Sequence, residues 1–289
     1  MPDLTPTIDP YVQGRGAPLG SREYYSLRFL APEVRDDLTA VHAFGREVAG
    51  LVEECTEPTV ARAKLAWWEH EVHGLRSGCG QHPVSRALGR VLQRHPLAPE
   101  RFQEMFNAAR DELDTPRYRD FPQLHRHCAR LGGTLSLMAA EVLGYEDART
   151  PVYARDLGIA LQLTDRLRDL GRDLRRGRLG LPLDELAGAG LEESELLANP
   201  CSAALRTLLE TQTERAAQHL QHAVGKLPAV DRWRQLPGVI QGRLSLMLLE
   251  EMRRDGYRML ERRVELTPLR MLWAAGRIAR RERRRQRRR

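Results

Sequence analysis

The stretch LQLTDRLRDLGRDLRRGRLGLPLDEL, residues 161–186, places aspartates at positions 165, 169 and 173. On a helix these side chains share one face, where like charges four residues apart repel by about 0.2–0.5 kcal/mol per pair. Such a face indicates a positive partner. Mg²⁺ is one candidate, because it prefers carboxylate oxygens together with water and substrate phosphates. A solvated face paired with the neighbouring arginines is the alternative.

The residues around this stretch predict a long helix. Thr150 and Pro151 are a capping residue followed by proline at the first helical position, and Gly177 is a suitable end. A helix between these signals has about 26 residues and is about 39 Å long. It is long enough to cross a whole domain.

Apolar residues recur with a helical period in other segments. Pro32 begins one helix, which continues through Leu38, Phe44 and Val52. We expect further helices over 58–77, 98–112, 121–143, 191–225 and 231–262. The hydrophobic content of 42% in 289 residues is enough for a large core, and no segment alternates with the period of a strand. The sequence predicts one all-α domain over 18–275, with a flexible N-terminus (1–17) and an arginine-rich tail (276–289).

The net charge of +7 comes from this tail. From Arg277 onward the chain has nine arginines and one glutamate, which leaves a net charge of −1 for the rest. A near-neutral body argues against nucleic acid as a partner. The tail predicts either an amphipathic helix on an anionic membrane or a disordered, solubilising segment. No apolar stretch is long enough to span a bilayer, and the four cysteines form no CxxC pair. We therefore expect a cytoplasmic protein, either free or peripheral at the inner face of the membrane.

Residues 158–186, GIALQLTDRLRDLGRDLRRGRLGLPLDEL, resemble the second aspartate-rich motif of the squalene and phytoene synthases. The order of Gln-Leu-Thr, Arg-Asp, Asp, Arg-Gly-Arg and Leu-Pro carries the resemblance. The segment SREYYSLRFLAPEVRDDLTAVHAFGRE (21–47) resembles the family's opening substrate segment and first helix. ARAKLAWWEHEV (61–72) and LLEEMRRDGYRMLERRVELTPLRMLW (248–273) are most similar to the bacterial presqualene diphosphate synthase subgroup. The resemblance covers residues 18–275.

The resemblance implies an isoprenoid-synthase helical bundle around a central cavity, in which two aspartate-rich helices hold Mg²⁺ against diphosphate. The implied reaction is prenyl transfer, the head-to-head condensation of two farnesyl diphosphates to presqualene diphosphate. The implied metal ligands are Asp165, Asp169, Asp173 and Glu53. The implied substrate-binding residues are Ser21, Arg22, His42, Arg46, Gln162 and Arg168, and among all of these Asp169, Asp173 and Arg46 are the expected catalytic residues.

The first aspartate-rich motif departs from the family pattern. Where the family has roughly REVDDxVDE, residues 46–54 are REVAGLVEE, so that Ala49 replaces a metal-binding aspartate. Further departures lie at His42, Gly50, Asp165, Arg172, Gly180 and Ser245. They leave open a second function, that of a catalytically degenerate paralogue acting as a binding or assembly protein. The sequence does not indicate an oligomeric state.

Overall fold

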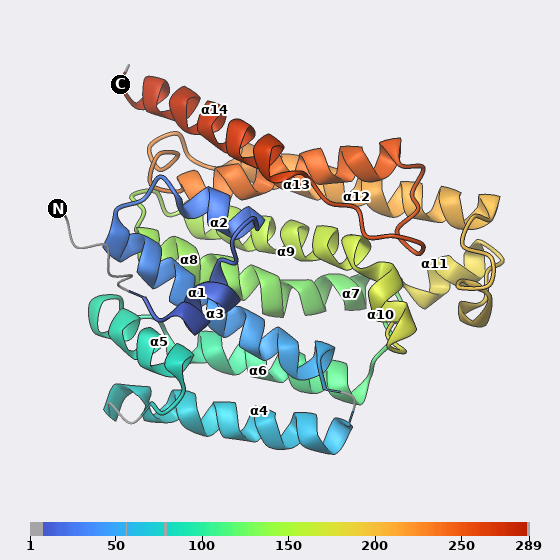
Figure 1. Ribbon diagram of the computed structural model, residues 1–289, viewed down its shortest axis with the longest axis horizontal. Coiled ribbons are helices and arrows are strands. Elements are labelled where there is room, and N and C mark those ends of the chain that lie inside the picture. The colour runs from blue at the N-terminus through green and yellow to red at the C-terminus, as the bar shows by residue number, and fades with distance from the viewer. Residues whose placement is uncertain (1–7, 56, 78–79, 288–289) are drawn as a thin grey trace.

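The computed structural model describes residues 8–55, 57–77 and 80–287, and its named elements are helices (Figure 1). The first eight α-helices are α1 (Pro10–Gly16), α2 (Arg22–Leu27), α3 (Pro32–Glu53), α4 (Pro58–His73), α5 (Pro83–Arg94), α6 (Pro99–Asp114), α7 (Phe121–Cys128) and α8 (Thr134–Leu143). The others are α9 (Thr150–Arg168), α10 (Leu170–Arg175), α11 (Leu183–Gly188), α12 (Ala203–Lys226), α13 (Leu236–Arg254) and α14 (Pro268–Gln286).

Three short helices of other types complete the fold. They are the 3₁₀ helices η1 (Gly74–Ser77) and η3 (Glu193–Glu195) and the π-helix η2 (Ala129–Gly133), which joins α7 to α8. Tyr118 and Pro182 form an isolated bridge, and no strand occurs in the part of the chain that the structure describes. The predicted all-α fold is confirmed.

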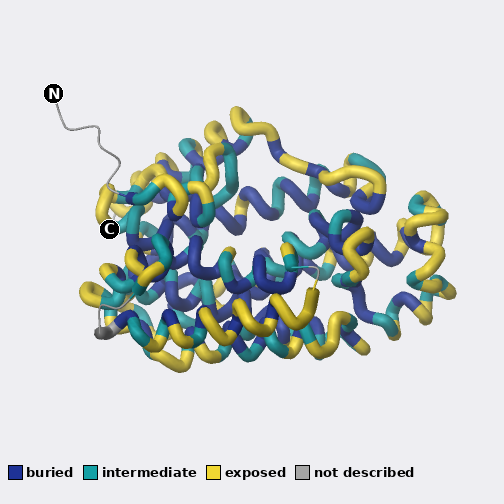
Figure 2. Tube along the Cα trace, turned by 60° about the horizontal axis from the view of Figure 1, so that its bottom comes forward, coloured by how far each residue is buried: buried dark blue, intermediate teal, exposed yellow. Residues whose placement is uncertain are grey.

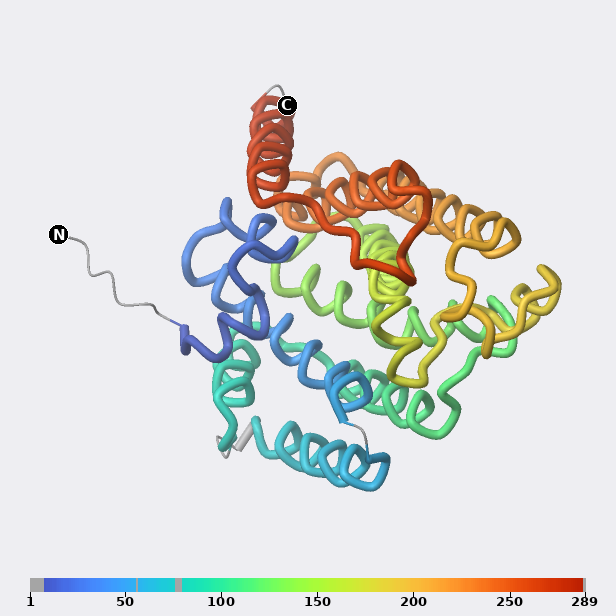
Figure 3. The backbone as a smooth tube through the Cα atoms, turned by 45° about the vertical axis from the view of Figure 1, so that its right-hand side comes forward, coloured from blue at the N-terminus to red at the C-terminus, as the bar shows by residue number. Residues whose placement is uncertain are grey.

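Helix α9 lies at the centre of the molecule, and Figure 3 shows it nearly end-on among the other helices. Its neighbours are α8, α12, α13 and η2, and Figure 2 shows this interior as largely buried. Gly132 of η2 and Gly158 of α9 allow a close approach, because a Cβ on Gly158 would lie 2.0 Å from the carbonyl oxygen of Gly132. Any larger residue there would push η2 and α9 apart.

Two apolar clusters meet around the centre. One joins α9 with α12, α13 and α14, and the other joins α3 with α4, α5 and α6. Phe44 of α3 is fully buried in the second cluster and packs edge-to-face on Trp68, Phe102 and Phe106. Such aromatic pairs add about 0.5–1.5 kcal/mol each beyond the area that they bury. The packing fixes α3 in place beside the central helix.

The helix predicted from 150 to 177 is interrupted. Asp169 has φ −95° and ψ 4° and separates α9 from α10. The next glycine, Gly171, lies against the chain that follows α13, where a Cβ would be 2.6 Å from the carbonyl oxygen of Met259. The start also differs, because Thr150 caps no helix and its hydroxyl donates to Asp231 instead, at 2.6 Å.

The N-terminal segment is the second correction. Residues 1–7 lie outside the described residues, but 10–16 form α1, where the sequence predicted a flexible segment up to residue 17. Asp9 caps this helix by accepting from the backbone N–H of Tyr11 at 2.8 Å, and Val12 is fully buried. Gly16 packs on the backbone of Thr39 in α3. Asp9 and Pro10 are a local start signal, but a helix of seven residues depends on tertiary packing for its stability.

Other predicted helices exist with different limits. The segment 58–77 ends as η1, and 121–143 contains the π-helical turn η2. The segment 191–225 is regular only from Ala203, and 231–262 is the helix α13 followed by a non-helical chain up to residue 267. The segment 98–112 corresponds to α6.

The arginine-rich tail continues a helix. Helix α14 runs through residue 276, where the sequence analysis placed a boundary, and it packs on α13 and α2. Glu282 is buried and pairs with Arg232 at 2.9 Å. Of the two alternatives for the tail, the helix is therefore the one observed over the described residues. No described helix combines the length and the apolar character needed to cross a membrane.

Candidate functional site

A pocket of about 600 Å³ lies between α3 on one side and α9 and α10 on the other. Its volume is within the range of about 300–1,000 Å³ that is common for small-molecule sites. All ten residues that the sequence singled out line it: Ser21, Arg22, His42, Arg46, Glu53, Gln162, Asp165, Arg168, Asp169 and Asp173. The predicted juxtaposition of the two helices is thus present in the structure.

The aspartate wall, formed by Asp165, Asp169 and Asp173, is neutralised by arginines. Asp165 pairs with Arg22 at 2.8 Å and with Arg168 at 2.9 Å. Burial alone would raise the pKa of Asp165, but the two guanidinium groups outweigh this effect and lower the pKa to about 2. The carboxyl is therefore ionised at neutral pH and holds both arginines in place.

The same pattern continues along α10. Asp169 accepts from Arg168 Nη2 at 2.6 Å and from Arg263 Nε at 2.7 Å. Burial opposes the ionisation of Asp169, but the adjacent guanidinium groups outweigh it and hold the pKa of this carboxyl below its usual value. Asp173 pairs with Arg178 at 2.9 Å. Each aspartate of this wall thus has at least one guanidinium partner.

The facing wall, formed by α3, carries less charge. Arg46 is exposed to the pocket and has no ion-pair partner among the described residues. Ala49 contributes only a methyl group, and Glu53 is the remaining carboxylate. Burial raises the pKa of Glu53, although Arg46 and Arg172 act in the opposite direction. This carboxylate is less well compensated than those of the aspartate wall.

The segment before α3 closes one end of the pocket. Ser21 caps α2 by accepting from the N–H of Tyr24 at 3.0 Å, which positions Arg22 to donate to both Asp165 and Ser245. His42 lies nearby, and burial lowers the pKa of its imidazole. Its buried Nδ1 has no hydrogen-bond partner in the described part of the chain. A neutral imidazole with a free polar atom can hydrogen-bond a ligand in this pocket.

Sequence reasoning missed several pocket residues. Arg263 lies in the chain between α13 and α14, just beyond the helix predicted over 231–262, and only the tertiary fold brings it to Asp169. Arg166 and Glu112 also line the pocket and pair at 3.0 Å, with His127 3.1 Å from the same carboxylate. This buried ion pair holds the pKa of Glu112 well below its usual range despite the burial. No spacing signal in the sequence links these three residues.

Apolar side chains also line the pocket. The lining includes leucines of η2, α8, α9 and α13 together with Met271 of α14: Leu131, Leu135, Leu161, Leu244 and Leu248. The pocket therefore combines arginines and carboxylates with apolar side chains. Ligands with an anionic head and a long hydrocarbon chain match this combination.

The four predicted metal ligands are all carboxylates, and Mg²⁺ prefers such oxygen ligands. Their arrangement, however, does not suit a metal ion. Each of the four already pairs with arginine, and among the described residues no three His, Cys, Asp or Glu side chains are placed to hold one metal ion. The metal centre predicted from Asp165, Asp169, Asp173 and Glu53 is thus an arginine–carboxylate network in this structure.

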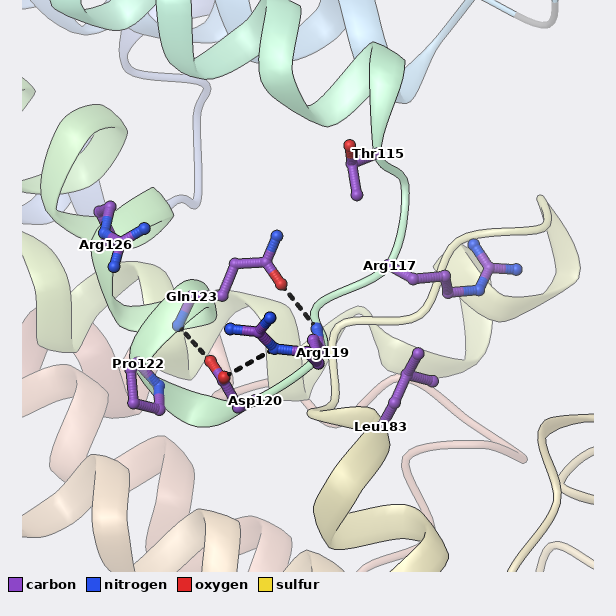
Figure 4. Close-up of a pocket in the computed structure, with 8 residues that line it drawn as sticks. All are labelled: Thr115, Arg117, Arg119, Asp120, Pro122, Gln123, Arg126 and Leu183. Atoms are coloured by element: carbon purple, nitrogen blue, oxygen red, sulfur yellow. Dashed lines mark hydrogen bonds and ion pairs between the residues drawn. The ribbon is translucent and has the colours of Figure 1, made fainter.

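Another hollow, of about 400 Å³, lies where α7 begins (Figure 4). Asp120 caps α7 by accepting from the N–H of Gln123 at 2.8 Å, and it also pairs with Arg119. The lining residues include none of the ten predicted site residues. The polar groups here stabilise the helix start, so the hollow is explained by local structure.

Comparison with known sequences identifies relatives of the chain. The family model described as squalene/phytoene synthase matches residues 20–270. The chain is 30% identical over 260 residues to a chloroplastic phytoene synthase of an Oncidium hybrid cultivar, covering 87% of this chain and 62% of that protein. It is 32% identical over 219 residues to phytoene synthase 1 of Arabidopsis thaliana, covering 73% and 52%. The chain thus spans little more than half the length of these relatives.

Solved structures share the fold. A dehydrosqualene synthase in complex with ligand superposes with a TM-score of 0.76 at 22% identity, covering 89% of this chain and 90% of that one. A squalene synthase from Alicyclobacillus acidocaldarius superposes with a TM-score of 0.71 at 20% identity, covering 86% and 92%. Because the family model also matches most of the sequence, this chain belongs to the squalene/phytoene synthase family.

Proposed function

We propose that this chain is a prenyltransferase that condenses two farnesyl diphosphates head to head to presqualene diphosphate. The observation that carries the proposal is a single pocket whose lining combines eight arginines with leucines and Met271. A prenyl diphosphate likewise combines an anionic group with an apolar chain. Membership of the squalene/phytoene synthase family supports this reaction class.

The arginines serve the first step, in which the C1–O bond of one farnesyl diphosphate breaks and diphosphate leaves. Arg46 is the pocket arginine without an ion-pair partner in the described chain, so it is free to bind the diphosphate directly. Arg22 and Arg168 are fixed by Asp165 and supply positive charge beside it. Preorganised charge of this kind stabilises a leaving group at little reorganisation cost.

The apolar side chains of the lining serve the second step. The allylic cation left by ionisation has to meet the second prenyl chain before water reaches it. Leu161, Leu244 and Leu248 line the pocket and offer no nucleophile. Exclusion of water favours carbon–carbon bond formation over hydrolysis to the alcohol, and the carbocation formed by this addition loses a proton, which the departed diphosphate can accept, as the cyclopropane ring closes.

Product analysis tests the proposal. Incubation with farnesyl diphosphate, followed by mass spectrometry of the intact product, should yield presqualene diphosphate. Parallel incubation with geranylgeranyl diphosphate measures the chain-length preference, which matters because the relatives compared above are phytoene synthases. A matched control is Arg253→Gln, which removes an exposed arginine that pairs with Glu250 outside the pocket. Preferred turnover of geranylgeranyl diphosphate would overturn the presqualene assignment.

The magnesium requirement remains a prediction from the family resemblance. The resemblance implies that Mg²⁺ would neutralise the departing diphosphate, held by Asp165, Asp169, Asp173 and Glu53. These carboxylates pair with arginines in the structure instead. Turnover measured with Mg²⁺ and with excess EDTA decides the requirement.

A binding or assembly protein is the second candidate function. The observation that favours it is Ala49, which leaves the α3 wall with one carboxylate in the pocket. A degenerate paralogue of this kind would bind prenyl diphosphates without releasing diphosphate. Equilibrium binding of a non-hydrolysable farnesyl thiodiphosphate, combined with the product analysis, separates the two functions.

We also propose that α14 contacts anionic lipid. Its exposed face begins with Leu269, Leu272 and Trp273, whose exposed fractions are 78%, 41% and 61%, and continues with arginines. Met271, on the buried face of the same helix, lines the pocket, so the start of α14 lies beside the pocket that would receive the prenyl chains. Amphipathic helices with apolar and arginine-rich faces bind anionic surfaces.

Vesicle sedimentation tests this contact. The variant Arg277→Gln/Arg281→Gln should lose about 2 kcal/mol of binding to phosphatidylserine vesicles, at about 1 kcal/mol per arginine. Raised salt should reduce binding of the unmodified chain through screening. The matched control, Arg253→Gln/Arg254→Gln, removes two exposed arginines of α13 and should bind as before. Equal binding by all three proteins would contradict the contact.

A further inference from the structure

Arg172 of α10 occupies an unusual position between the two walls of the pocket. Its Nη2 lies 3.0 Å from a carboxylate oxygen of Asp173, 3.4 Å from one of Glu53 and 3.6 Å from one of Asp169. Glu53 belongs to α3, whereas the two aspartates belong to the opposite wall. A single positive nitrogen therefore stands among three carboxylates from two facing helices.

The three carboxylates are oxygen donors of the kind that Mg²⁺ prefers. In the described chain they are not placed to hold one metal ion, and the guanidinium lies between them. A guanidinium among them repels a dication and already uses their oxygens. The nitrogens Nε and Nη2 make the contacts, whereas no hydrogen bond joins Nη1 to any described residue. The arginine thus retains donors that can reach an anion.

The balance of charges over the whole pocket lining is consistent with a cationic side chain at this position. Its lining carries eight arginines and seven carboxylates, and the imidazole of His42 is kept neutral by burial. A pocket that holds several divalent cations needs a surplus of carboxylates, whereas this lining has none. A surplus of positive charge instead suits an anion that arrives with few metal ions or none.

We infer that Arg172 is a built-in cation: its guanidinium takes the place of a metal ion between α3 and α10, so that the pocket binds a diphosphate group without a metal there. The inference rests on the proposed function only in taking the bound anion to be the diphosphate group of a prenyl substrate. Arg172 also pairs across the two walls with Glu53.

The primary test measures metal binding in the absence of substrate, with Mn²⁺ as a paramagnetic substitute for Mg²⁺. Titration of the full chain, monitored by the electron paramagnetic resonance signal of free Mn²⁺, should show weak binding for the unmodified protein. The variant Arg172→Gln should bind Mn²⁺ at least about tenfold more tightly, because the repelling charge is gone and three carboxylates are released. Arg172→Lys keeps the charge and should bind as weakly as the unmodified protein.

The matched control is Arg176→Gln. Arg176 lies four residues away and also reaches Glu53, but it donates to the backbone carbonyl and not to the carboxylate. Its removal should leave Mn²⁺ affinity unchanged. If the unmodified chain binds Mn²⁺ as tightly as Arg172→Gln, the metal displaces the arginine and the inference is wrong.

A second measurement needs no variant. Calorimetric titration of the unmodified chain with inorganic pyrophosphate in excess EDTA should show binding, and added Mg²⁺ should tighten it by less than about tenfold. Binding that appears only after Mg²⁺ is added would overturn the inference even if Arg172→Gln fails to fold. Neither titration depends on turnover. A chain that binds pyrophosphate without metal but makes no prenyl product would leave this inference standing and remove the proposed reaction.

Discussion

The two walls of the pocket differ in how closely they keep the family pattern and in how their charges are balanced. The aspartate wall carries three carboxylates, one of them at the departure Asp165, and arginines compensate each of them. The α3 wall has lost one carboxylate at Ala49, and the remaining Glu53 is tied across the pocket by Arg172. Ala49 removes a negative charge, and Arg172, another departure from the family pattern, places a positive charge between the walls. Both departures move the pocket in the same direction, away from metal and toward direct anion binding.

The largest expected effect comes from breaking the α3 wall at Arg46. Because Arg46 is free of ion pairs in the described chain, Arg46→Gln removes direct diphosphate binding without breaking an ion pair, although Glu53 loses a nearby positive charge that lowers its pKa. Loss of one transition-state contact typically costs about 10²–10³ in rate. Steady-state release of diphosphate from farnesyl diphosphate should fall by this factor, while Arg253→Gln, outside the pocket, should be unaffected. A loss of rate below about threefold would show that another group binds the leaving diphosphate.

The second prediction restores the family pattern on both sides. Ala49→Asp together with Arg172→Glu adds two carboxylates and removes the guanidinium between the walls. We expect turnover of this double variant to depend on Mg²⁺ by a factor of about 10² or more, whereas the unmodified chain should lose much less activity in EDTA. The comparison of rates with Mg²⁺ and with EDTA measures this. Equal metal dependence of both proteins would mean that the charge difference between the walls has no functional consequence.

The third prediction concerns stability at the aspartate wall. The pKa of Asp165 is lowered to about 2 in the folded chain. The ionised carboxylate therefore contributes to the free energy of unfolding above the unfolded pKa of about 3.9, and this contribution is lost as pH falls through about 2. Asp165→Asn should therefore lower the free energy of unfolding by about 2 kcal/mol at pH 7. Denaturant titration at pH 7 and pH 3 should show the difference shrinking at the lower pH. If the difference in unfolding free energy between the two proteins is the same at both pH values, the destabilisation comes from lost packing and not from the ionised carboxylate.

The smallest effect has the opposite sign and belongs to the α3 wall. Burial raises the pKa of Glu53 in the folded chain. The protonated carboxyl therefore contributes to the free energy of unfolding below the unfolded pKa of about 4.3, and this contribution is lost as pH rises through the pKa of the folded state. Glu53→Gln should then slightly stabilise the chain at pH 7 and have no effect near pH 4. Thermal unfolding at the two pH values measures this. Destabilisation at pH 7 would show that the pair with Arg172 outweighs the burial of Glu53.

The membership of the site could be predicted from the sequence, but its contacts could not. All ten predicted residues line one pocket, because the motifs that resemble the family specify which helix faces meet. Pairing of the aspartates with neighbouring arginines was one of the two alternatives, but the sequence did not indicate which arginines would pair with which carboxylates. Arg263 reaches Asp169 from a segment 94 residues away in sequence, and Arg172 reaches Glu53 across the pocket. Long-range pairs of this kind depend on tertiary packing, which local spacing does not encode.

The same distinction holds for the helices. Helix α3 begins at Pro32 as predicted, because proline at the first turn is a local signal. The break at Asp169 was missed, since it lies where Gly171 packs on the backbone of Met259, a contact that helical periodicity cannot show. Helix α1 was missed for a related reason, because its sequence has two glycines and it depends on packing against α3.

The stoichiometry of diphosphate release tests the central claim most directly. The unmodified chain is incubated with farnesyl diphosphate, and the diphosphate released is compared with the farnesyl diphosphate consumed. Head-to-head condensation to presqualene diphosphate predicts one diphosphate released for every two substrate molecules consumed, since the product retains the other. Release of one diphosphate per substrate, with farnesol as product, would contradict the condensation, and binding without any release would support the paralogue that only binds.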